Sequence, residues 1–115
     1  MSKFTQGEWK YLDELYQVCA YTDTEEPGLL ADITGEIGCK GFFNEEEVHA
    51  NGRLIASAPK MYWLLTEMLK ISAMKAQAST EKNDPLFMKA LVAQDGAENI
   101  AKKLLEYING MEAQP

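Results

Sequence analysis

The side chains whose type and spacing could recognise a ligand begin with an aromatic pair. Phe42 and Phe43 are adjacent, so in an extended segment one ring would enter the core while the other lay over a cleft. A ring in that position could stack on a flat base, and Lys40 could meet a phosphate beside it. Both rings could equally belong to the core or an interface, and Lys40 could be solvated. Three glutamates at 45–47 also make the neighbouring helix start electronegative.

An asparagine on the following helix adds an amide to this set. At about 100° per residue, Asn51 projects onto the middle of an otherwise apolar face. A buried amide must find hydrogen-bond partners, so Asn51 either satisfies backbone at the end of the sheet or binds a ligand between helix and loop. Arg53 points to the opposite side, where solvent, a subunit interface and a neighbouring subunit's ligand remain open. The apolar face comprises Val48, Gly52, Ile55 and Ala58.

Residue types that catalyse reactions or bind metals do not form a known pattern. The glycine-rich stretch GEIGCKG lacks the GK[ST] ending of a phosphate-binding loop. Cys19, Cys39 and His49 do not have the spacing of a zinc site. His49 shares an i, i+4 stripe with Glu45 and Arg53, which favours a solvated charge stripe over a catalytic base. We therefore expect no enzyme activity, no metal and no cofactor.

Length and charge restrict the class of protein further. A chain of 115 residues is expected to form one domain, residues 1–115. Its net charge of −7 argues against binding a nucleic-acid polymer but leaves a small nucleotide in a local pocket open. No apolar run approaches the roughly 20 residues of a membrane span, and the first residues lack a signal-peptide core. We expect a cytoplasmic protein that does not enter membranes.

The first forty residues have the pattern of short strands separated by turns. Three strands are predicted at Glu8–Leu12, Leu15–Tyr21 and Leu29–Thr34, with Asp13–Glu14 as the turn of the first hairpin. Because the connections are short and polar, an antiparallel meander is expected. Residues 1–43 form this sheet segment, and a short fourth strand around the phenylalanine pair would complete it.

The middle of the chain has a clear helix start and an interruption. Asn44 can cap the helix, and Glu47 completes a capping box three residues on. Pro59 predicts a kink or a break, or else the first residue of a second helix. The prediction is a helix over 44–78 that is kinked at Pro59.

The last part of the chain predicts a second long helix. A loop is predicted at Ser79–Asp84, and Asp84–Pro85 suits the cap and first residue of the next helix. The helix over 84–110 stops at Gly110, and Asp95–Gly96 could interrupt it. The fold class is therefore α+β, with a small antiparallel sheet followed by a helical hairpin. The amphipathic helices carry more apolar surface than the sheet can cover, which favours a homo-oligomer formed through them.

One sequence signature resembles a family of small phage and prophage proteins. The stretch NGRLIASAP, Asn51–Pro59, resembles the family's NARLIAAAP, with Gly52 and Ser57 in place of alanines. The opening FTQGEW is similar to the family's usual T-P-G-P-W start. The resemblance covers about residues 4–70 and implies a phage-encoded protein in a bacterial host.

The order of sheet and helices is also similar to the first family of anti-Thoeris proteins. These are phage sponges that assemble through their helices and sequester cyclic ADP-ribose-type signals, and in some cases cyclic oligonucleotides, without cleaving them. The resemblance implies that Phe42 or Phe43 stacks on a base, Asn51 reads it, and Arg53 or Lys40 meets phosphate, with a subunit boundary as one location. The alternative is an acidic protein that inhibits or adapts a host protein by direct contact.

Overall fold

The computed structural model describes residues 3–22, 26–33 and 44–111. Over these residues the chain forms a three-stranded sheet and then three helices, which confirms the α+β class. The elements are β1 (Glu8–Leu12), β2 (Gln17–Tyr21), β3 (Gly28–Asp32), α1 (Glu45–Ala56), α2 (Ala58–Glu81) and α3 (Asp84–Ile108).

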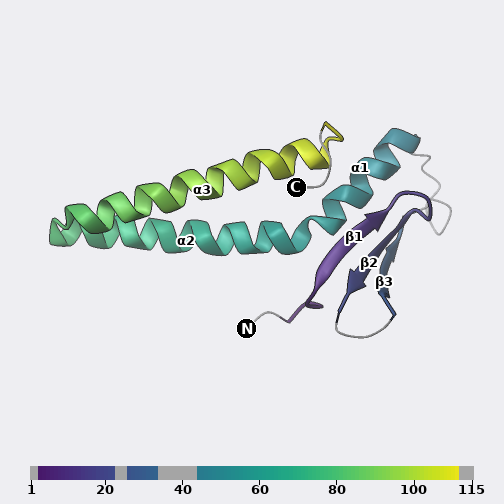
Figure 1. Cartoon of the computed structure of the whole chain (residues 1–115), viewed down its shortest axis with the longest axis horizontal. Coiled ribbons are helices and arrows are strands. Elements are labelled where there is room, and N and C mark those ends of the chain that lie inside the picture. Colours follow the sequence, from purple (N-terminus) through teal and green to yellow (C-terminus); the bar gives the residue numbers. More distant parts are fainter. Residues whose placement is uncertain (1–2, 23–25, 34–43, 112–115) are drawn as a thin grey trace.

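The molecule is long for its size. Figure 1 shows the sheet and α1 at one end, with α2 and α3 extending away from them as a hairpin. The extents are 57 × 31 × 25 Å and the radius of gyration is 18.1 Å. A compact domain of this length would have a radius of gyration of about 13 Å. Much of the hairpin therefore lies away from the sheet.

The sheet is the predicted antiparallel meander, in the order β1-β2-β3. Trp9 lies opposite Ala20 and Tyr11 opposite Val18, with an irregularity between Val18 and Cys19. β1 has the predicted bounds. The polar connections are too short for a crossover, so neighbouring strands in sequence are neighbours in the sheet.

The turn between β1 and β2 differs from the prediction. It extends to Tyr16, whose φ is +53°, and the Leu15 N–H donates to the Leu12 carbonyl over 3.1 Å. β2 consequently begins at Gln17, because Leu15 and Tyr16 are used in the turn. β3 ends at Asp32, while the predicted fourth strand at 42–43 lies outside the described residues.

α1 starts where its sequence predicts and covers one face of the sheet. The Asn44 side-chain oxygen accepts a hydrogen bond from the Glu47 N–H over 2.8 Å, which satisfies an otherwise unpaired donor of the first turn. The helix contacts β1 and β2. Residues buried at this end of the molecule are Val18, Cys19, Ala20, Val48, Gly52 and Ala56.

The single kinked helix predicted over 44–78 is two helices, α1 and α2, which meet at an angle in Figure 1. The interruption falls at Ser57, and Pro59 lies in the first turn of α2, where its missing N–H costs nothing. Ser57 is buried, and its hydroxyl donates to the Arg53 carbonyl over 2.8 Å. That bond satisfies the one buried polar side chain of the described core.

The α2–α3 hairpin packs along a seam with seven-residue spacing. Alanines from both helices allow a close approach near the connecting turn, and leucines occupy the end of the seam nearer the sheet. Partly buried methionines and alanines flank it. The buried seam positions are Leu64, Ile71 and Ala78 on α2, and Ala90, Ala97 and Leu104 on α3.

The ends of the hairpin helices correct two predictions and confirm a third. α2 continues to Glu81, through the residues predicted as a loop. Asn83 rather than Asp84 caps α3, and its side chain accepts from the Leu86 N–H over 3.0 Å. α3 runs through Gly96 without a break. It stops before Gly110, whose φ of +75° supports the predicted glycine stop.

Candidate functional site

The predicted site residues on α1 do not come together within one chain. Asn51 is exposed, so its predicted burial is wrong. The buried stripe of α1 instead follows Val48, Gly52 and Ala56, four residues apart. Arg53 lies roughly 200° around the helix from Asn51. The predicted binding residues Lys40, Phe42 and Phe43 lie outside the described residues.

Arg53 has a partner on the hairpin. Its Nε donates to the Ile108 carbonyl over 3.0 Å, at the end of α3. The arginine is half-buried and lies in the last turn of α1, where a cation also suits the helix dipole. Within one chain, Arg53 therefore joins α1 to α3.

A cluster of polar aromatic side chains surrounds His49. The Tyr11 hydroxyl and His49 Nδ1 lie 2.5 Å apart, and the Tyr16 ring stacks on the imidazole with centroids 5.4 Å apart and planes 6° apart. Glu45 Oε1 lies 3.4 Å from His49 Nε2. The predicted solvated stripe of Glu45, His49 and Arg53 is thus partly covered by tyrosines of β1 and the following turn.

Burial raises the pKa of the Tyr11 hydroxyl, and the nearby Asp13 raises it further, while Arg53 lowers it. The phenol therefore stays protonated at neutral pH and can donate its proton to His49. Burial likewise raises the pKa of Tyr107, near the end of α3, against the effect of Arg53. This cluster holds α1 on the sheet, and the i, i+4 pattern could not reveal it because Tyr11 lies 38 positions away.

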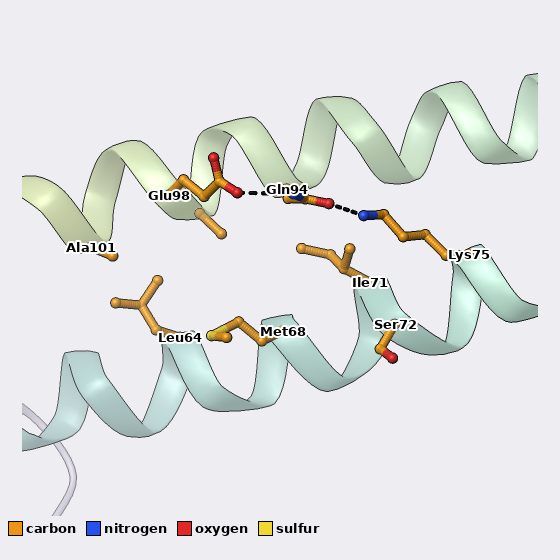
Figure 2. Close-up of a pocket in the computed structure, with 9 residues that line it drawn as sticks. Leu64, Met68, Ile71, Ser72, Lys75, Gln94, Glu98 and Ala101 are labelled. Carbon is orange, nitrogen blue, oxygen red and sulfur yellow. Dashed lines mark hydrogen bonds between the residues drawn. The ribbon is translucent and has the colours of Figure 1, made fainter.

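An open groove of about 370 Å³ runs between α2 and α3. Figure 2 shows Leu64 and Ile71 pointing from α2 into the space between the helices. A chain of hydrogen bonds crosses it: the Lys75 ammonium donates to Gln94, and Gln94 Nε2 donates to Glu98 Oε1 over 2.9 Å. The groove therefore has an apolar floor and a polar bridge between the helices from Lys75 to Gln94, with Ser72 and Glu98 also on its wall.

The surface of the hairpin is unusually rich in exposed apolar side chains. Leu69 is 74% exposed and Val92 is 70% exposed, so neither contributes to the core of one chain. Large exposed apolar surfaces in soluble domains commonly mark interaction sites. Other exposed apolar residues of the hairpin are Tyr62, Trp63, Leu65, Met68, Phe87, Met88, Leu91, Ile100 and Leu105.

The described part of the chain shows neither a cluster of metal-ligating side chains nor a membrane-spanning helix. Across residues 3–22, 26–33 and 44–111, no group of three or more His, Cys, Asp or Glu side chains converges. None of the described helices combines the length and apolarity needed to cross a membrane. Cys19 is a free, buried thiol.

One comparison with known proteins gives a match. The family model described as Salmonella phage P22 protein Y8K6 matches residues 1–104. The match includes the sheet, α1, α2 and most of α3. No curated protein and no solved structure matches the chain.

Proposed function

We propose that this chain, which belongs to the phage protein family of Salmonella phage P22 protein Y8K6, acts by binding and not by catalysis. In this proposal it sequesters a nucleotide-type signal, a cyclic ADP-ribose isomer or a cyclic oligonucleotide, in the cytoplasm of the host. Several copies assemble through the α2–α3 hairpin to do so. The ligand leaves the protein chemically intact.

The exposed apolar surface of the hairpin is the observation that carries the proposal. Met68 and Leu105 are 58% and 59% exposed, so neither side chain is buried where α2 and α3 pack together. Burial of the exposed part of such a side chain contributes about 1 to 2 kcal/mol, which favours a second chain over water as its neighbour.

The positions of Asn51 and Arg53 support a ligand site that involves more than one subunit. Their side chains leave α1 on opposite sides, and Arg53 already donates to Ile108 in its own chain. A single protomer therefore cannot direct both groups at one small ligand. In an assembly, the exposed amide of one copy can complement a cation of the next.

Thermal denaturation with a panel of nucleotides tests the proposal. Cyclic ADP-ribose isomers and cyclic di- and trinucleotides are added to the purified chain, with inorganic phosphate as the control. A true ligand, at about 100 times its Kd, should raise the Tm by about 5 °C or more. When the protein is denatured by heat and the released ligand is analysed by chromatography, the ligand should be chemically unchanged. No shift with any cyclic nucleotide would contradict sequestration, and a cleaved product would contradict the non-catalytic mode.

The second candidate function is contact with a host protein. It is favoured by the exposed apolar side chains of the hairpin, which commonly mark interaction sites, and by the net charge of −7 of the whole chain, which suits contact with a basic protein surface. Here the hairpin should co-purify one host protein at fixed stoichiometry. A charge introduced at Leu69 should abolish this complex, and retention of the complex would contradict hairpin docking.

A further inference from the structure

A second pocket, of about 310 Å³, lies between the N-terminal segment and the first turns of α2. Three aromatic side chains line it: Phe4 from the N-terminal segment, and Tyr62 and Trp63 from α2. Tyr62 is 49% exposed and Trp63 is 46% exposed, so both rings keep accessible surface. The volume is at the lower end of that of small-molecule sites.

The N-terminal wall of the pocket is fixed by local geometry. The Phe4 ring packs edge-on against Tyr62, with centroids 5.0 Å apart, and against Trp9, with centroids 6.0 Å apart. Gly7 has a φ of +105°, and a side chain there would overlap the carbonyl of Tyr21. The glycine thus permits the turn that returns Phe4 to α2. The FTQGEW opening of the sequence therefore builds one wall of the pocket.

The polar groups of the pocket suit a base that carries one anionic group. Lys70 lies on its rim, where its ammonium is 3.4 Å from Glu67 Oε1. A phosphate can share the Lys70 ammonium with the Glu67 carboxylate or take the place of that carboxylate. The carboxylate can accept a hydrogen bond from the exocyclic amine of a base. Gln6 and Thr66 also line the pocket, where the Gln6 amide donates to the Phe4 carbonyl over 2.8 Å and the Thr66 hydroxyl donates to the Tyr62 carbonyl over 3.0 Å. Their oxygens keep the capacity to accept a hydrogen bond from a base.

The pocket continues into a smaller cavity of about 160 Å³. Gly7 and Pro59 line both, and Lys60 lines the smaller one. Glu8 also lines the smaller cavity, so the aromatic space adjoins an extension that carries both a lysine and a carboxylate.

This pocket is separate from the groove between α2 and α3. Successive residues of a helix turn by about 100°, which places Thr66 and Lys70 on the opposite flank of α2 from Met68 and Ser72. The lining residues confirm the separation, since the two spaces share none.

We propose that the pocket formed by Phe4, Tyr62 and Trp63 binds a nucleoside monophosphate, with the base against the aromatic rings and the phosphate at Lys70. Base–aromatic stacking holds the base, and the lysine distinguishes a nucleotide from a nucleoside. The site rests on the proposed function only in the choice of nucleotides as probes. It exists whether or not the protein sequesters a signal.

Titration of the full chain with AMP tests the site, because Trp63 lines the pocket and its fluorescence should change when the pocket is occupied. AMP should quench the tryptophan fluorescence saturably, adenosine should bind more weakly, and inorganic phosphate should not quench. Tyr62→Leu should weaken AMP binding about ten-fold or more by removing a stacking surface. Lys70→Gln should weaken AMP binding about five-fold and leave adenosine binding unchanged.

Two exposed α3 residues provide matched controls. Val92→Ala and Lys103→Gln change an apolar and a cationic side chain away from the pocket, and both should keep the wild-type affinity. Absence of saturable quenching by AMP, or equal weakening in the controls, would overturn the proposal. Cyclic nucleotides that bind equally well to Tyr62→Leu would also place their site elsewhere, with sequestration intact. AMP binding without any cyclic ligand would support the pocket and contradict sequestration.

Discussion

The Nε of Arg53 donates to the carbonyl oxygen of Ile108 over 3.0 Å, and this bond joins the end of α1 to the end of α3. The two residues are 55 positions apart in sequence. α1 packs on the sheet, while α3 packs on α2. The bond is therefore one of the links between the sheet end of the molecule and the hairpin.

Arg53→Met should loosen this link without emptying the core. The methionine keeps the aliphatic stem but loses the charged donor, so we expect a loss of about 1 kcal/mol in the free energy of unfolding. Hydrogen exchange should become faster at the end of α3, around Ile108, before it changes in the seam. Lys103→Met, at an exposed α3 position, is the control. Unchanged exchange at Ile108 would show that the bond does not hold the helix end.

Gly52→Ala should destabilise the fold although alanine is the better helix former. A Cβ at Gly52 would overlap the Tyr11 ring and lie 2.7 Å from Ile33 Cδ1. The ring can move away only by giving up its contact with His49. We expect a cost of about 1 to 3 kcal/mol in urea denaturation, larger than the gain in helix propensity of about 1 kcal/mol.

Gly96→Ala is the matched control for that substitution. Gly96 lies within α3, and a Cβ there would meet nothing within 4 Å. It should stabilise the protein by up to about 1 kcal/mol, because only helix propensity and chain entropy change. Equal stabilisation by both substitutions would mean that Tyr11 and Ile33 do not restrict position 52. The pair also gives a physical reason why the chain has glycine within the NGRLIASAP stretch.

Elements specified by local signals were predictable from sequence. The start of α1 depends on Asn44 and Glu47, three positions apart, and its cap forms as predicted. The stop of α3 depends on Gly110, where the Met111 N–H also donates to the Glu106 carbonyl over 2.8 Å. Both signals act within one or two helical turns, so distant packing does not change them.

The sequence did not predict which side of α1 the sheet would cover, and therefore not which α1 side chains would be buried. A helical projection places Asn51 among apolar residues, but the sheet meets α1 along Val48 and Gly52 and leaves the amide exposed. His49 was predicted in a solvated stripe because its partner Tyr11 belongs to a distant strand. The residues of one helix cannot show which side a separate sheet will cover.

Tyr11→Phe should lower stability at neutral pH and weaken its fall in alkali. The pKa of the Tyr11 phenol is raised in the folded state, chiefly by burial. The protonated phenol therefore makes its full contribution to the free energy of unfolding below the unfolded-state pKa of about 10. This contribution is lost as the pH rises through the higher pKa of the folded state. We expect a loss of about 1 kcal/mol at pH 7 from the missing bond to His49. Thermal melts from about pH 7 to pH 11 measure both effects, relative to the wild type.

Tyr21→Phe is the control for the alkaline transition. Tyr21 is 37% exposed on β2, and its ring lies under the Lys10 ammonium instead of against α1. This variant should retain the alkaline loss of stability that Tyr11→Phe weakens. A wild-type protein whose Tm is constant through this range would contradict a raised pKa at both Tyr11 and Tyr107.

Leu69→Glu should convert the proposed assembly to single chains while each chain stays folded. Leu69 is 74% exposed, so a carboxylate there is solvated in the monomer but would be buried without a partner in an interface. Light scattering should show a mass near 12.9 kDa for the variant and a multiple of it for the wild type. Thr80→Glu, exposed near the end of α2, should assemble like the wild type. A wild type that is monomeric at all concentrations would contradict assembly through the hairpin, and circular dichroism separates loss of assembly from unfolding.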